Sequence, residues 1–179
     1  YLDLTSGFGV ASLGHAAPEV PRAVARQAGR LHQSLGDLSP DASRERLARR
    51  LSTLGGRLSR VLLASTGSGA VELVLKTAAV ATGRRRVVAF RGAYHGASYG
   101  ALEVTDHPKP IPPLRSQLAG RAIHVPFPYS YRCPVSAGGS CGCDLRCLDR
   151  AFETIDRECS GSDPPGAVIV EPIQGRAGV

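Results

Sequence analysis

The chain opens with two stretches in which apolar residues recur every three or four positions, the spacing of one face of an α-helix. The first follows Pro18, a residue favoured at the start of a helix, and its apolar face comprises Val20, Val24, Ala28 and Leu31. The second follows Ser39 and Pro40, ends at Gly55 and Gly56, and has an apolar face of Leu47, Leu51 and Leu54. Two amphipathic helices are therefore predicted.

Beyond these helices the pattern changes to short, uninterrupted apolar runs at 61–64, 87–90, 122–125 and 167–170. Runs that do not alternate are typical of strands buried on both faces, as in parallel sheets covered by helices. Between the first two runs, one side of a predicted helix carries Val71, Val74, Leu75, Ala78 and Ala79. The pattern predicts an α/β fold with three layers, α/β/α, and a mostly parallel sheet.

The segment at about 106–143 is rich in proline, glycine and cysteine and is too long for an ordinary connection, so it is predicted to be an excursion from the sheet. Four of the five cysteines crowd into or beside it: Cys133, Cys141, Cys143 and Cys147. Four thiolates could bind zinc, but this spacing lacks the paired Cys-x-x-Cys of common structural sites. No metal is therefore expected. The thiols are expected to be reduced, because the sequence has no secretory signal that would imply disulfides.

Composition places the chain of 179 residues, 42% of them hydrophobic, among globular proteins with a sizeable core. The net charge of +7 includes one run of arginines, at 84–86, without interleaved aromatic residues, so a solvated face explains it better than nucleic acid. No stretch approaches the ~20 apolar residues of a membrane span, and a cytoplasmic location without a membrane partner is expected. Because the chain starts at Tyr1 and stops at Val179 directly after a strand-like run, it is expected to be a fragment.

The turn at 65–70, STGSGA, joins the first predicted strand to its helix. Unpaired N–H groups and the helix dipole favour anions at a helix start, so a turn of small residues suits a phosphate. A plain capped turn explains the same residues equally well. The turn lacks the Gly-Lys-Ser/Thr of a Walker loop and the three-glycine dinucleotide spacing, which weakens a Rossmann-type dehydrogenase as an alternative.

Two further segments follow predicted strands, at the sheet edge where ligands bind in parallel sheets. The first, GAYHG at 92–96, contains Tyr94, which could stack on a flat heterocycle, and His95. The second, EPIQG at 171–175, begins with Glu171, which could orient a substrate or pair with an arginine. Packing of a half-buried tyrosine, an ordinary loop histidine and a surface glutamate are the simpler alternatives.

Together these segments resemble the class III aminotransferases, fold type I pyridoxal-phosphate enzymes that include 4-aminobutyrate, ornithine and acetylornithine aminotransferases. The likeness extends over nearly the whole chain, including the opening LDLTSG and GHAAP, although a second histidine often stands where this chain has Ala17. The segment at 128–134 looks like a loop of some members, which favours a structural excursion over a metal site.

The resemblance implies pyridoxal 5'-phosphate as cofactor. On the family pattern Thr66, Gly67 and Ser68 hold its phosphate, and Tyr94 stacks on its ring. His95 lies beside the ring and Glu171 at the gate of the substrate site. The resemblance also assigns 1–40 to a smaller subdomain and 41–179 to part of the large cofactor-binding domain.

The activity implied is transfer of an amino group from an amino acid or ω-amine to a 2-oxo acid, by a homodimer. The family's Schiff-base lysine and the acidic partner of the pyridinium nitrogen are expected after Val179, because Lys76 and Lys109, the only two lysines, match neither position. The fragment alone is expected to be inactive. The same scaffold hosts aminomutases, racemases and decarboxylases, and an inactive chain kept for binding or assembly is the remaining alternative.

Overall fold

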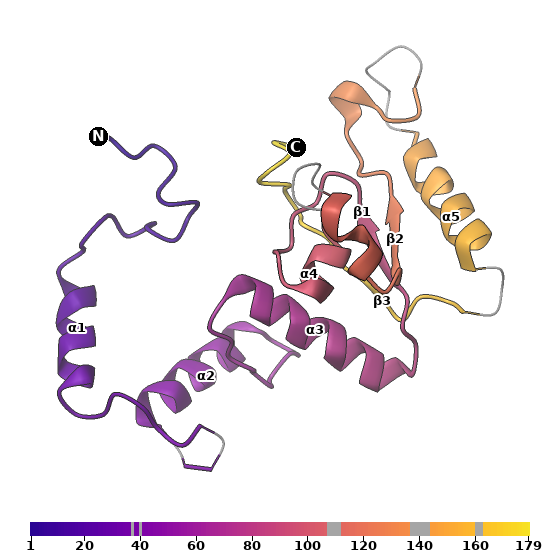
Figure 1. Cartoon of the computed structure of the whole chain (residues 1–179). Helices are drawn as coiled ribbons and strands as arrows, with labels where there is room; N and C mark the ends of the chain where they lie inside the picture. The colour runs from indigo at the N-terminus through magenta and orange to yellow at the C-terminus, as the bar shows by residue number, and fades with distance from the viewer. Residues whose placement is uncertain (37, 40, 107–111, 137–143, 160–162) are drawn as a thin grey trace. The chain divides into compact units, whose positions relative to one another are not determined.

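A computed structural model describes residues 1–36, 38–39, 41–106, 112–136, 144–159 and 163–179 (Figure 1). The chain divides into two compact units, Tyr1–Val61 and Leu62–Val179, which are described separately. The first unit extends past residue 40, and the assignment of 1–40 to a smaller subdomain stays a prediction. In the described part of the chain, no helix has the length and apolarity needed to cross a membrane.

The first unit contains helices α1, Glu19–Ala28, and α2, Ala42–Leu54. Pro18 is the N-cap of α1, so this helix begins one residue later than predicted. The start predicted for α2 at Ser39 and Pro40 is wrong: Asp41 caps it, because its carboxylate accepts a hydrogen bond from the Arg44 amide at 2.7 Å. Pro40 lies outside the described residues. The end of α2 before Gly55 is confirmed.

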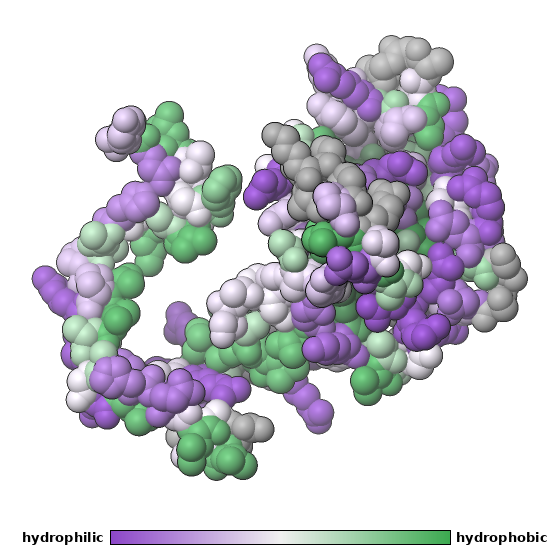
Figure 2. Space-filling model, in the orientation of Figure 1, coloured by the Kyte–Doolittle hydropathy of each residue, from purple (hydrophilic) through white to green (hydrophobic). Residues whose placement is uncertain are grey.

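Neither α1 nor α2 contains a buried residue. The predicted apolar face of α1 is shorter than expected, because Leu31 lies beyond the end of the helix. Apolar side chains of both helices are exposed, as in Val24 at 62% and Leu54 at 76% of full exposure. Hydrophobic residues accordingly form green patches on the surface in Figure 2. Both helices are amphipathic in sequence, but no other described part of their own unit buries their apolar faces.

The second unit is built on a parallel sheet of three strands in the order β2-β1-β3. The strands are β1, Val87–Phe90, β2, Ala122–Val125, and β3, Ala167–Val168. In the register, Val88 lies opposite Ile123 on one side and Val168 on the other. The second and third predicted strands are confirmed. The fourth is shorter than predicted, since the last strand contact is the bond from the Ile169 amide to the Val88 carbonyl.

The predicted strand at 61–64 is wrong. These residues precede helix α3, Gly67–Thr82, without regular secondary structure, and Leu62 is 69% exposed. An apolar run becomes a strand only when a neighbour pairs its backbone groups, and no strand of the described sheet pairs with this run. The predicted β-α-β unit is therefore reduced to a helix followed by β1.

Helices cover both faces of the sheet, as Figure 1 shows. Helix α5, Arg146–Cys159, packs on the face that carries Val88, Ile123 and Val125. Helix α3 and the short helix α4, Tyr99–Glu103, lie on the face that carries Val87 and Ala89. Alternate residues of each strand thus enter two separate cores, and the predicted α/β/α layering is confirmed.

The predicted excursion is not continuous, because β2 lies within it. Two 3-10 helices flank this strand: η1, Pro112–Gln117, and η2, Ser130–Arg132. Cys133 and Cys147 are buried, whereas Cys141 and Cys143 lie outside the described residues. Among the residues that are described, no group of three or more potential ligands could hold a metal ion.

Candidate functional site

Thr66, Gly67 and Ser68 form the start of α3. Thr66 is the N-cap, and its Oγ1 accepts a hydrogen bond from the Gly69 amide at 2.9 Å. Within the described residues, the amides of Gly67 and Ser68 have no acceptor. A Cβ at Gly67 would meet no atom within 4 Å, so the space beside this turn is open. Two N–H groups at the positive end of a 16-residue helix can therefore receive an anion.

Ser68 connects this turn to the loop that follows β1. Its Oγ lies 2.5 Å from Ser98 Oγ and accepts a hydrogen bond from the Ser98 amide at 3.0 Å. The approach is close because Gly96 has no side chain: a Cβ there would lie 2.7 Å from Ser68 Oγ. Gly96 also has φ of 129°, which side-chain-bearing residues rarely adopt. The turn and the segment at 92–98 therefore share one edge of the unit.

Tyr94 and Glu171 meet directly at the carboxyl ends of β1 and β3. The Tyr94 amide donates to Glu171 Oε1 at 2.7 Å, and the Gly175 amide donates to Glu171 Oε2 at 3.3 Å. The Glu171 carboxylate thus orients the backbone that carries Tyr94. The guanidinium of Arg176 lies 4.3 Å from the centre of the Tyr94 ring, so one face of this ring is covered, where an available face was expected.

His95 is held by its backbone, whose amide donates to Thr105 Oγ1 at 2.9 Å. Burial lowers the pKa of the His95 imidazole; the carboxylate of Glu171 opposes this shift, and His124 adds to it. Burial likewise lowers the pKa of His124. The Nε2 atoms of both rings are buried without a hydrogen-bond partner in the described structure. The structure therefore favours a neutral His95.

Three polar residues that the sequence did not single out stabilise the same loop. Thr105, 1% exposed, accepts from the His95 amide, and Asp106 Oδ2 accepts from the Gly92 amide at 3.0 Å. Gln174, also 1% exposed, donates from Nε2 to the Arg91 carbonyl at 2.9 Å. Their only signal in the sequence is proximity: two follow α4 directly, and Gln174 stands three residues after Glu171.

A hollow of about 660 Å³ opens at the carboxyl ends of the strands, with Phe90, Phe127 and Glu171 in its lining. Neither Tyr94 nor the turn at 66–68 lines it. A second hollow, of about 240 Å³, lies at the opposite edge, where β1 and β2 begin, and Lys76 lines it. Lys76 is therefore remote from the carboxyl edge. Lys109 lies outside the described residues.

The sequence model of the aminotransferase class-III family matches residues 1–179. A diaminobutyrate–2-oxoglutarate aminotransferase of Rhizobium meliloti is 36% identical over 192 residues, which cover 100% of this chain and 39% of that protein. An acetylornithine aminotransferase of Streptomyces clavuligerus is 37% identical, with 100% of this chain and 38% of that protein covered. The chain thus spans about two-fifths of these relatives.

Solved structures of transaminases have the same fold as this chain. A thermostable (S)-enantioselective ω-transaminase of Thermomicrobium roseum aligns with a TM-score of 0.82 and 29% identity, covering 99% of this chain and 40% of that one. A taurine:2-oxoglutarate aminotransferase of Bifidobacterium kashiwanohense, solved with pyridoxal phosphate and glutamate, shares the fold at a TM-score of 0.80 and 23% identity, over 97% of this chain and 39% of that one. The chain belongs to the aminotransferase class-III family, and the resemblance inferred from its motifs is confirmed.

Proposed function

We propose that this chain carries the phosphate-binding and ring-binding parts of a pyridoxal-phosphate-dependent aminotransferase. One observation carries the proposal: the turn at the start of α3, whose Gly67 and Ser68 amides have no acceptor within the described residues, is joined by the Ser68 hydroxyl to Ser98, in the loop that presents Tyr94. A phosphate site and an aromatic platform on one edge suit a planar heterocycle that bears a phosphate.

In this proposal the amides of Gly67 and Ser68 donate to the phosphate, and the Thr66 hydroxyl supplies a further hydrogen. A helix start of this kind stabilises an anion by up to ~2 kcal/mol in favourable geometry. Tyr94 stacks on the ring, and this contact adds about 0.5–1.5 kcal/mol beyond simple burial. The neutral His95 lies beside the ring.

Glu171 has two proposed roles. Its carboxylate orients the Tyr94 backbone, and it borders the hollow at the carboxyl edge, which suits a residue at the gate of the substrate site. When bound, pyridoxal phosphate supplies the electron sink for the deprotonated donor and carries the amino group between the two half-reactions. The lysine that holds the cofactor is assigned to the protein outside these 179 residues, because Lys76 lies at the opposite edge and Lys109 does not match the family's lysine in the sequence resemblance.

The amino donor proposed is an amino acid or an ω-amine, and the acceptor is a 2-oxo acid. The names of two relatives, which specify 2-oxoglutarate, support this acceptor. A cytoplasmic homodimer is part of the proposal. The exposed apolar faces of α1 and α2 are consistent with a partner surface.

The test uses the full protein loaded with pyridoxal phosphate. Incubation with 2,4-diaminobutyrate, acetylornithine or ω-amines and 2-oxoglutarate should yield glutamate, and borohydride reduction should give one pyridoxyl adduct on a lysine outside residues 1–179. Isomerised, racemised or decarboxylated donor without glutamate would point to another reaction on the same scaffold. Failure to bind the cofactor would support an inactive chain. A stoichiometric adduct on Lys76 or Lys109 would show that the site is misplaced.

A further inference from the structure

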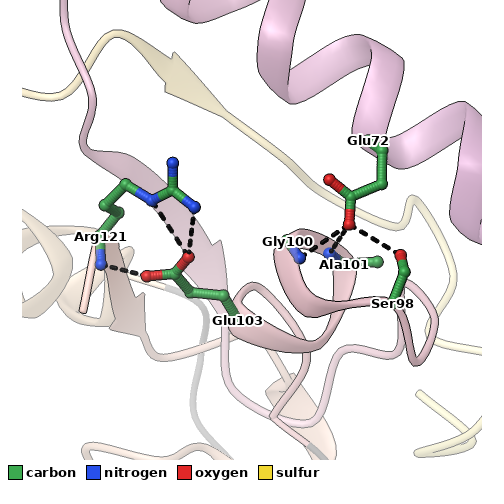
Figure 3. A network of polar contacts seen from close by, with 6 residues as sticks. All are labelled: Glu72, Ser98, Gly100, Ala101, Glu103 and Arg121. Carbon is green, nitrogen blue, oxygen red and sulfur yellow. Dashed lines mark hydrogen bonds and ion pairs between the residues drawn. The ribbon is translucent and has the colours of Figure 1, made fainter. Parts of the chain in front are cut away.

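Glu72, in the second turn of α3, is the centre of a polar network that the sequence motifs did not include (Figure 3). Its Oε1 accepts hydrogen bonds from Ser98 Oγ at 2.8 Å, from the Gly100 amide at 2.7 Å and from the Ala101 amide at 3.2 Å. Ser98 is the N-cap of α4 but makes no capping bond with its own side chain. A carboxylate from another helix therefore supplies the cap of α4.

The Glu72 side chain is ionised in this network. Burial raises the pKa of its carboxyl, but the hydrogen bonds from Ser98, Gly100 and Ala101, together with the charge of Lys76, outweigh burial and lower the pKa below its ordinary value. An ionised carboxylate can only accept hydrogen bonds. The Ser98 hydroxyl must therefore donate its hydrogen to Glu72.

This direction determines what the Ser68 hydroxyl does. Ser98 Oγ has given its hydrogen to Glu72, so in the 2.5 Å contact it is the acceptor and Ser68 is the donor. Ser68 Oγ in turn accepts from the Ser98 amide. The only hydroxyl hydrogen of Ser68 is thus used in the bond to Ser98 and is not available to another acceptor.

The packing leaves little room for another arrangement. A Cβ at Gly100 would lie 2.5 Å from Glu72 Oε2, and a Cβ at Gly96 would lie 2.8 Å from Ser68 Cβ. Helix α4 is also fixed at its other end, where Glu103, 7% exposed, binds the Arg121 guanidinium at 3.1 and 3.2 Å and the Arg121 amide (Figure 3). The two ends of α4 can therefore be perturbed separately.

We propose that Glu72 is a positioning residue for the cofactor phosphate. Through Ser98 it holds Ser68 in one orientation, so that the amides of Gly67 and Ser68, and not the Ser68 hydroxyl, donate to the phosphate. This inference rests on the proposed cofactor site. It goes beyond that proposal because Glu72 touches no part of the cofactor and acts only through the chain of hydroxyl groups.

The experiment compares the affinities of the full apoprotein for pyridoxal phosphate and for pyridoxal, which lacks the phosphate, by absorbance titration. Losing the charge-assisted bonds of Glu72 in Glu72→Ala should weaken pyridoxal phosphate about tenfold and change pyridoxal by less than about twofold. Glu72→Gln keeps an oxygen at the Oε1 position and should lose no more than about threefold. Arg121→Gln, the control, loosens the other end of α4 and should leave the ratio of the two affinities unchanged.

A double-mutant cycle tests the link between the residues. If Glu72 acts through Ser68, then Ser68→Ala should also lower the affinity for pyridoxal phosphate about tenfold. The double variant should then lose no more affinity than the single variant with the larger loss. Additive losses, or equal losses for pyridoxal phosphate and pyridoxal, would overturn the inference. If Glu72→Ala does not fold, as judged by its thermal midpoint, Ser98→Ala makes the same test. A parent protein without any preference for pyridoxal phosphate would overturn the proposed function as well.

Discussion

Glu72 receives three hydrogen bonds on one carboxylate oxygen beside the turn at 66–68, whereas Glu171 receives one bond on each oxygen beside Tyr94. On the side of this turn, called the turn side, a Cβ at Gly96 would collide with Ser68 and a Cβ at Gly100 would collide with the Glu72 carboxylate. On the side of the Tyr94 ring, called the ring side, Glu171 lies in the segment at 171–179, and one face of the ring is covered by Arg176.

The difference indicates how each half would behave before a ligand arrives. The turn side is locked by close packing of α3 and α4 and presents its amides in a fixed direction. The ring side depends on contacts from the segment at 171–179 and already has a cation on one ring face. Substitutions on the turn side should therefore change stability and phosphate recognition, and those on the ring side should change binding of the heterocycle.

The largest effect is expected for Gly96→Ala in the full protein. The new Cβ would lie within 3.0 Å of Ser68 and would require an unfavourable positive φ, so the free energy of unfolding should fall by about 2–4 kcal/mol. Urea denaturation of the apoprotein measures this change. Gly67→Ala is the control, since its Cβ meets nothing within 4 Å and its stability should stay within about 0.5 kcal/mol. Equal stability of the two variants would contradict the close approach.

Glu171→Ala should release the Tyr94 backbone and weaken pyridoxal phosphate and pyridoxal alike, by about tenfold, because the lost bonds position the ring platform and not the phosphate. The same titrations measure both affinities. Glu153→Ala, which removes an exposed carboxylate on α5, is the control and should change neither. A loss confined to pyridoxal phosphate would remove the distinction between the two sides.

Tyr94→Ala should weaken cofactor retention about three- to tenfold, the equivalent of the lost stacking contact. The free energy of unfolding should change by less, since the Tyr94 side chain is only half-buried. Tyr94→Phe keeps the ring and should retain the cofactor, as measured by dialysis followed by absorbance. Unchanged retention in Tyr94→Ala would place this residue outside the site.

The smallest effect is the pH dependence that arises from His95 and His124. Burial lowers both pKa values in the folded state, so the unfolded chain binds protons at a higher pH than the folded one. Their contribution to stability is complete above the unfolded pKa, about 6.5, and declines as the pH falls below it. Urea midpoints between pH 7.5 and 5.5 should therefore decrease, and His124→Gln should show a shallower decrease. A midpoint that rises on acidification would show the opposite sign.

Local patterns in the sequence were sufficient for much of the fold. The helix faces, the strands at 87–90 and 122–125 and the cap at Thr66 follow from periodicity and from side chains that bond to their own backbone nearby. The motifs also placed Tyr94 and Glu171 on one edge, because parallel strands end on the same side of a sheet. The same argument for Thr66 depended on a strand at 61–64 that the structure does not contain. These features depend on neighbours within a few residues or on a general rule of topology.

Only the tertiary structure decided which distant residues form hydrogen bonds with one another. Glu72 reaches Ser98, 26 residues away, and Glu171 reaches the Tyr94 amide, 77 residues away. No periodicity specifies such pairs, because hydrogen bonds between distant segments depend on how the helices and strands pack. At 61–64 the sequence predicted an element that the tertiary structure does not form. Its apolar pattern is that of a strand, but a strand also needs a neighbour to pair its backbone, and the sequence by itself cannot supply one.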